Sequence, residues 1–220
     1  MPRWPSATRI TAAAPITSVA SPAPQGRNPR AGRRYPCFDQ RVNSADDTQP
    51  STVCPGCRAV LPRSAWPGTT KYNATPECAE AAGELLGFEI ANTARLGYLH
   101  QLRIDAYGAQ HVHPDAPPIG PVFALNGLYM FLERGSGNLA VRTAHGIMAN
   151  SYDDWPRLVP PARVGELTAY DVLTAGGVDE VESTLLRWAR DVWESWPDAE
   201  RETVRNLTLE LVPERYFEHP

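Results

Sequence analysis

Two cysteines that flank a Pro-Gly turn constrain this 220-residue chain more than any other feature. The stretch Cys54-Pro55-Gly56-Cys57 forms a CPGC motif. A tight turn of this kind presents two sulfurs to one tetrahedral metal ion, at about 2.3 Å from each sulfur. Pro55 fixes one backbone angle and Gly56 permits the next, so the turn forms at little cost. The motif supplies half of a structural metal site, and two more ligands are expected elsewhere.

The same spacing also occurs in thiol-disulfide enzymes, and two cysteines can also be inert. A redox CxxC motif usually begins a helix that follows a strand. Here Pro62 and Pro67 follow the motif, and no strand–helix alternation surrounds it, which favours a metal. The four cysteines are too few for a disulfide framework, which points to a reducing compartment such as the cytoplasm. Cys37, the cysteine nearest the N-terminus, is predicted to be a spare thiol.

Charge divides the chain into two parts. Residues 1–50 carry seven arginines against three aspartates, a net charge of +4, and are rich in Pro, Ala and Ser. This composition predicts a disordered tail, because it buries too little apolar surface to offset ordering. Residues 51–220 carry 14 basic and 22 acidic residues, a net charge of −8. We therefore expect no nucleic-acid binding by the folded part.

No apolar run of membrane-spanning length is present, so no membrane association is expected. The partner that the sequence leaves open is a protein or a small molecule. The first fifty residues also lack the continuous apolar segment of a secretory signal.

Apolar spacing predicts an all-α fold, in which a helical bundle follows an irregular zinc-knuckle segment in one domain over residues 51–215. Thr75 as N-cap and Pro76 in the first helical position mark the first helix, whose apolar positions include Cys78 and Ile90. The third helix is apolar nearly all round, which predicts a central position. Helices are expected over residues 76–92, 94–111, 120–135, 138–151, 168–176 and 178–197, with a last one beginning at 198.

The remaining ligands follow from the geometry of the first two helices. A short break near Thr93 joins them, so they should pack antiparallel and bring Cys78 opposite residues 108–111. His111 lies in that segment, whereas His100 lies about 16 Å earlier along the axis and would face Leu86. The predicted zinc site is therefore Cys54, Cys57, Cys78 and His111, with His113 as the substitute for His111. Three thiolates and one imidazole close the shell, which favours a structural role.

Other polar residues of the second helix are candidates for a supporting role. Asp105 and Tyr107 lie near the predicted site, and a carboxylate there could orient His111 or cap the surface. A polar face of this helix could line a pocket or form a solvated stripe, and the stripe is favoured; it comprises His100, Arg103, Tyr107 and Gln110. The functional alternatives are a binding or regulatory module with structural zinc, a hydrolase or transferase with an open zinc, and a thiol-disulfide oxidoreductase.

The ordered motifs CPGCRAVLP, a lone cysteine at a helix start and HQLRIDAYGAQHVHP resemble those of an uncharacterised bacterial family of unknown function. That family carries a CPGCG motif, a lone Cys and a DAYxxQHP motif in this order. The resemblance spans Cys54 to Leu207 and implies no activity. The sequence departs from the family pattern at Arg58, where the family usually has Gly, and at Val112-His113, which separate His111 from Pro114. Its matched positions are Cys54, Cys57, Cys78, His100, Asp105, Tyr107, Gln110 and His111.

Overall fold

The computed structural model describes residues 50–63 and 71–217. The tail predicted to be disordered, with Cys37, lies outside these residues except for Pro50, and so does Pro67. None of the described helices combines the length and the apolar character that a membrane span requires.

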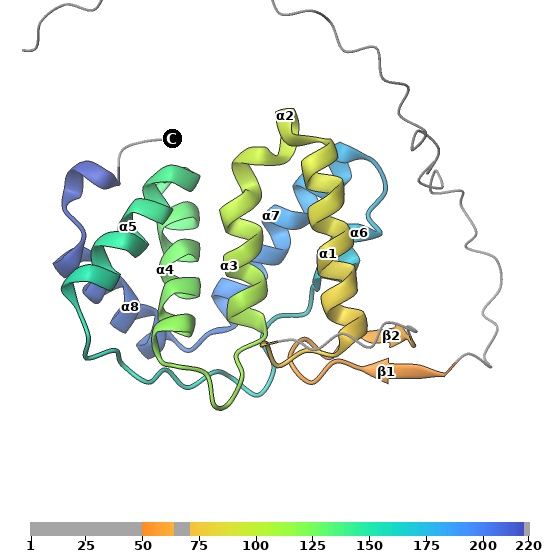
Figure 1. The fold of residues 1–220 in the computed structure, drawn as a ribbon, viewed down its shortest axis with the longest axis horizontal. Helices are drawn as coiled ribbons and strands as arrows, with labels where there is room; N and C mark the ends of the chain where they lie inside the picture. The colour runs from red at the N-terminus through yellow and green to blue at the C-terminus, as the bar shows by residue number, and fades with distance from the viewer. Residues whose placement is uncertain (1–49, 64–70, 218–220) are drawn as a thin grey trace, which may run out of the picture. The chain divides into compact units, whose positions relative to one another are not determined.

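Most of the described residues are helical, and the strands among them form one short hairpin near the CPGC motif (Figure 1). Strands β1 (Ser51–Val53) and β2 (Val60–Pro62) pair antiparallel, with Thr52 opposite Leu61. The predicted all-α class with an irregular N-terminal segment is confirmed. The helices are α1 (Pro76–Ala91), α2 (Thr93–Leu96), η1 (Gly97–Leu99), α3 (His100–Gln110), α4 (Ile119–Arg134), α5 (Asn138–Ser151), α6 (Ala169–Leu173), α7 (Val178–Ser195), α8 (Asp198–Leu211) and η2 (Glu214–Tyr216).

Helix α1 begins where the sequence predicts it. Thr75 is the N-cap, and its side-chain oxygen accepts a hydrogen bond from the backbone N–H of Cys78 at 3.3 Å. Pro76 occupies the first turn, where its missing N–H has no cost. The cap therefore fixes Cys78 in the first turn, at the end of α1 that lies beside the hairpin (Figure 1).

The second predicted helix is interrupted, because the side chain of Asn138 enters its hydrogen-bond ladder. Nδ2 of Asn138 donates to the carbonyl of Gly97 at 2.7 Å, and its Oδ1 accepts from the N–H of Gln101 at 3.1 Å. Gly97 and Gln101 would bond directly in a continuous α-helix. An inserted polar side chain is a known cause of such breaks. The chain therefore runs through α2 and the short 3₁₀ turn η1 before α3 begins.

Helix α4 has the central position that its sequence predicts, and it packs against α3, α5, α7 and α8. It ends at Gly135, which adopts the left-handed conformation with φ 68°. The predicted apolar stripe of the long C-terminal helix is buried at Val181, Leu185, Trp188, Val192 and Trp196.

The prediction for Ile90 is wrong, because this side chain is 64% exposed. The buried face of α1 follows Cys78, Ala81, Leu85 and Glu89 at three- and four-residue spacing. Ile90 is rotated about 100° away from that face, since a helix has 3.6 residues per turn.

Candidate metal centre

Four buried side chains bring their donor atoms together between the hairpin, the start of α1 and the end of α3. The Sγ atoms of Cys54, Cys57 and Cys78 and a ring nitrogen of His111 all lie within 4.8 Å of one another. The Sγ atoms of Cys57 and Cys78 are 3.8 Å apart, and Cys78 Sγ lies 3.3 Å from Nε2 of His111. A tetrahedral ion with bonds of about 2.3 Å to sulfur has donor–donor edges of about 3.8 Å. The group could therefore hold a metal ion.

The turn that carries the first two cysteines is closed by backbone hydrogen bonds. The N–H of Cys54 donates to the carbonyl of Ala59 at 2.9 Å, and the N–H of Arg58 donates to the carbonyl of Cys54 at 3.0 Å. Arg58 has φ 65°, and among the described residues it is the single non-glycine residue with a positive φ. This conformation favours glycine. The departure at Arg58 therefore leaves the turn in place but adds backbone strain.

Gly56 lets this turn approach α3 closely. A Cβ atom on Gly56 would lie 2.5 Å from the carbonyl oxygen of Asn73 and 2.6 Å from Cδ2 of His111. The N–H of Asn73 donates to the carbonyl of His111 at 2.9 Å, and this hydrogen bond holds the two segments together. Only glycine fits between the cysteines at this distance.

The orientation of His111 is set by Tyr107, one helical turn earlier. Nδ1 of His111 lies 2.9 Å from the carbonyl oxygen of Tyr107, so it must carry the proton, and Nε2 presents its lone pair to the cysteines. The two rings stack with their centroids 4.1 Å apart. The hydroxyl of Tyr107 also donates to Sγ of Cys78 at 3.9 Å. Tyr107 therefore contacts two of the four donor residues.

The three buried thiols have very different pKa values because they share one small volume. The pKa of Cys54 is strongly lowered, because Cys57 and Cys78 hydrogen-bond to its thiolate. The pKa of Cys57 is raised to about 11, since its proton is held in the hydrogen bond to Cys54. The pKa of Cys78 is raised for the same reason. One thiolate thus opposes ionisation of the next, and a bound cation would let all three ionise together.

The proposed role of Asp105 in orienting His111 is wrong. Its carboxylate accepts from Gln101 Nε2 at 2.9 Å and lies against Gly127 of α4. The partner of the His111 ring is instead the backbone of Tyr107.

The predicted solvated stripe on α3 is also wrong, because Arg103, Tyr107 and Gln110 are buried. The amide of Gln110 donates to the carbonyls of Val164 and Leu167, each at 2.7 Å, and accepts from Nε1 of Trp188 at 3.0 Å. It ties the irregular segment before α6 to α3 and α7.

Arg103 and His100 meet a buried carboxylate that the sequence analysis did not identify. Glu89 is 3% exposed. Its Oε2 lies 2.6 Å from Nε of Arg103, and its Oε1 lies 2.5 Å from Nδ1 of His100. His100 therefore contacts Glu89 rather than facing Leu86. The antiparallel register that pairs residue 78 with residue 111 also pairs 89 with 100, so this register could have revealed the contact.

His113 does not join the four donor atoms. Its ring is partly exposed, and Nδ1 accepts from the N–H of Asp115 at 3.1 Å. The structure thus places His111, and not its substitute, beside the three cysteines.

A sequence comparison shows the family of this chain. Residues 52–197, more than half of its length, match the family described as "Family of unknown function (DUF5946)". The chain belongs to this family. Neither a curated protein nor a solved structure gave a match to the chain.

Proposed function

We propose that this protein is a zinc-binding helical module, in which zinc closes a structural Cys₃His centre and supports a binding or regulatory function. The observation that carries this proposal is the convergence of Cys54, Cys57, Cys78 and His111 within 4.8 Å. Thiolates with one imidazole in a tetrahedral arrangement suit zinc among the common metal ions.

The burial of the donors supports a structural role over a catalytic one. The cysteines are 0–3% exposed and His111 is 0% exposed. Catalytic zinc ions usually have three protein ligands and keep one position for water. Four protein donors fill the tetrahedron. When bound, the ion would join the hairpin to α1 and α3, and its binding energy would become folding energy.

Metal analysis tests this proposal directly. We expect one equivalent of zinc per chain in the purified protein, and loss of zinc together with loss of helical signal in Cys78→Ser and His111→Ala. His113→Ala is the matched control, since it removes a nearby histidine that does not contact the donors. A wild-type protein without metal, or His111→Ala with full zinc, would contradict the proposal.

X-ray absorption at the zinc edge separates the structural centre from its alternatives. We expect three sulfur neighbours at about 2.3 Å and one nitrogen at about 2.0 Å. A shell with a water oxygen in place of one protein donor would instead indicate a hydrolase or transferase. A metal-free Cys54–Cys57 disulfide that forms reversibly would indicate an oxidoreductase.

We place the protein in a reducing compartment such as the cytoplasm. The support is the buried group of three free cysteines, which lies in an arrangement suited to thiolate ligands.

A further inference from the structure

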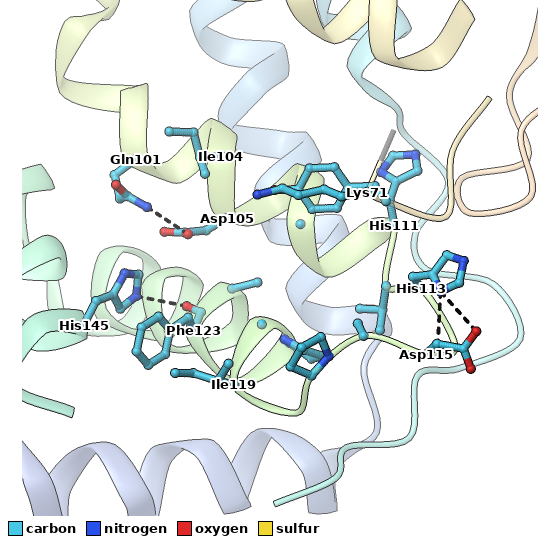
Figure 2. Close-up of a pocket in the computed structure, with 18 residues that line it drawn as sticks. Lys71, Gln101, Ile104, Asp105, His111, His113, Asp115, Ile119, Phe123 and His145 are labelled. Carbon is cyan, nitrogen blue, oxygen red and sulfur yellow. Dashed lines mark hydrogen bonds and ion pairs between the residues drawn. The ribbon is translucent and has the colours of Figure 1, made fainter. Parts of the chain in front are cut away.

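A cavity of about 530 Å³ lies beside the metal centre, between α3, α4 and the segment that precedes α1 (Figure 2). Its volume is within the range of small-molecule sites, about 300–1,000 Å³. His111 forms part of its wall, and the remaining metal ligands do not. The cavity is therefore a neighbour of the metal centre and a separate site.

Most of the cavity wall is apolar. Helix α3 contributes Ile104, and α4 contributes Ile119, Pro121 and Phe123. Phe123 is fixed in place, because its ring stacks on His145 at a centroid distance of 4.5 Å. Such a wall suits the hydrocarbon part of a ligand.

One acidic side chain in this wall lacks a complete set of hydrogen-bond partners. Asp105 is 4% exposed, and its Oδ1 accepts from Gln101 at 2.9 Å. Its Oδ2 is buried and has no hydrogen bond within the part of the chain that the structure describes. Buried polar atoms nearly always have a hydrogen-bond partner, so we expect this oxygen to accept a hydrogen bond from a bound ligand. Asp105 lines the cavity, and the last torsion of an aspartate is soft, so its carboxylate can reorient when a donor binds there.

The other ionisable groups at the cavity do not neutralise Asp105. Figure 2 shows Gln101 and Asp105 on one side and Phe123 and His145 on the other. His145 is neutral, because burial lowers its pKa to about 4 and its Nε2 donates to the carbonyl of Phe123 at 3.1 Å.

At the opening, Lys71 is exposed and lies over the ring of Tyr72, 5.2 Å from its centroid. His113 and Asp115 line the rim and contact each other. No ion pair of Asp105 is present among residues 50–63 and 71–217.

We propose that this cavity binds a small primary amine with an apolar body, whose ammonium group donates to Oδ2 of Asp105. An ammonium supplies the missing donor, and its positive charge stabilises the ionised form of the carboxylate. A carboxylate ligand would instead place a second acidic group beside Asp105, and a neutral hydrocarbon would leave Oδ2 without a donor. Burial raises the pKa of Asp105, and a cation beside it would favour the ionised carboxylate again.

The test compares three probes of the same shape and different charge: benzylammonium, benzyl alcohol and benzoate, titrated by calorimetry into the metal-loaded protein. We expect saturable binding of benzylammonium at least about tenfold tighter than that of the other two. Asp105→Asn keeps the shape of the side chain and should reduce the affinity for benzylammonium to that for benzyl alcohol. Asp153→Asn, which is exposed and lies outside the cavity wall, is the matched control and should leave the affinity for benzylammonium unchanged.

Two more variants locate the site. A side chain at Gly120 meets open space, so Gly120→Trp should fill the cavity without disturbing α4 and abolish binding of the amine. Lys71→Met removes a positive charge at the opening that repels the ammonium group, and it should tighten binding of the amine.

The proposal is overturned if benzylammonium does not bind saturably, if the three probes bind equally, or if Asp105→Asn keeps the preference for the amine. Weaker binding of the amine together with tighter binding of benzoate in wild type would assign the cavity to anions and overturn it as well. Zinc content, measured on the same samples, reports separately on the metal centre. The inference goes beyond the proposed zinc centre and survives if that centre holds another metal.

Discussion

Gly127 of α4 lies so close to Asp105 of α3 that a Cβ atom on Gly127 would stand 1.8 Å from Oδ2 of the aspartate. The same Cβ atom would lie 3.1 Å from Cβ of Asp105, so moving the carboxylate alone does not create enough space. The contact explains how two central helices pack so tightly around a buried acid. It also explains why a glycine is required inside a helix, where it otherwise costs stability.

Gly127→Ala is expected to destabilise the fold by about 1–3 kcal/mol, because the carboxylate must leave its place and α4 must move away from α3. Denaturant unfolding of the zinc-loaded protein measures the change. Gly87→Ala is the control: it lies in α1, where an added Cβ meets nothing within 4 Å. It should stabilise by up to about 1 kcal/mol through helix propensity.

A double-mutant cycle shows whether the contact with Asp105 is the cause. In an Asp105→Ala background the carboxylate is gone, so Gly127→Ala should lower the free energy of unfolding clearly less than it does in the wild type. Equal costs in both backgrounds would mean that the tight contact lies elsewhere on α4.

Gly56→Ala is expected to weaken metal binding while leaving all four ligands in the sequence. The new Cβ would collide with Cδ2 of His111 and with the Asn73 carbonyl, and so push the imidazole away from the cysteines. We expect a loss of zinc affinity of at least about tenfold, by analogy with changes that misorient a metal ligand. Competition with a chromophoric chelator measures it.

The control for this prediction lies two residues further along the same turn. Arg58→Gly relieves the strain at φ 65° and should keep zinc affinity at or above the wild-type value. Unchanged affinity in Gly56→Ala would show that the turn can retreat from α3.

Tyr107→Phe is expected to lower zinc affinity by about tenfold, the lower end of the range for groups that support metal ligands. The substitution keeps the ring that stacks on His111 and removes only the hydroxyl that donates to Sγ of Cys78. Chelator competition is the measurement. Tyr98→Phe is the matched control, since that hydroxyl donates to Glu182, away from the metal centre. Equal affinities in both variants would remove Tyr107 from the support of the site.

The candidate metal centre could be predicted from the sequence because its geometry is local. Thr75 and Pro76 fix where α1 begins, and the break near Thr93 fixes the antiparallel register that brings residue 78 to residue 111. The contact between Tyr107 and His111 also follows from their i, i+4 spacing, which puts both on one face of α3. Asp105 is six residues from His111, about 120° around the helix, and this spacing already places it away from the candidate metal centre.

What the sequence could not supply are partners that come from distant segments. Gln110 is buried because Trp188, 78 residues later, offers its indole N–H. Asn138 breaks the second helix from 41 residues beyond Gly97. Polar side chains at helical spacing look the same whether they meet water or a distant partner, so the solvated stripe was the natural but wrong expectation. The cavity at Asp105 was equally hidden, because α4 and α5 form its far side.

Asp105 should also make stability depend on pH in a direction opposite to that of most carboxylates. Burial raises the pKa of its folded state well above 3.8, with the hydrogen bond from Gln101 opposing the shift only in part. Between the unfolded and folded pKa values the folded state therefore binds more protons, and its stability falls as pH rises. The loss reaches about 1.4 kcal/mol for each pH unit of that window.

Asp105→Asn removes this titration and keeps the shape of the side chain. The free energy of unfolding of the variant minus that of the wild type should therefore increase from pH 5 to pH 8, as measured by denaturant unfolding of both proteins in parallel.

His145 affects stability in the opposite direction. Its folded pKa is lowered to about 4, so its contribution to stability is lost as pH falls from about 6.5 toward 4. That contribution and those of the metal ligands are common to both proteins and cancel in the difference. A flat or falling difference for Asp105→Asn would mean that Asp105 is already ionised in the folded protein.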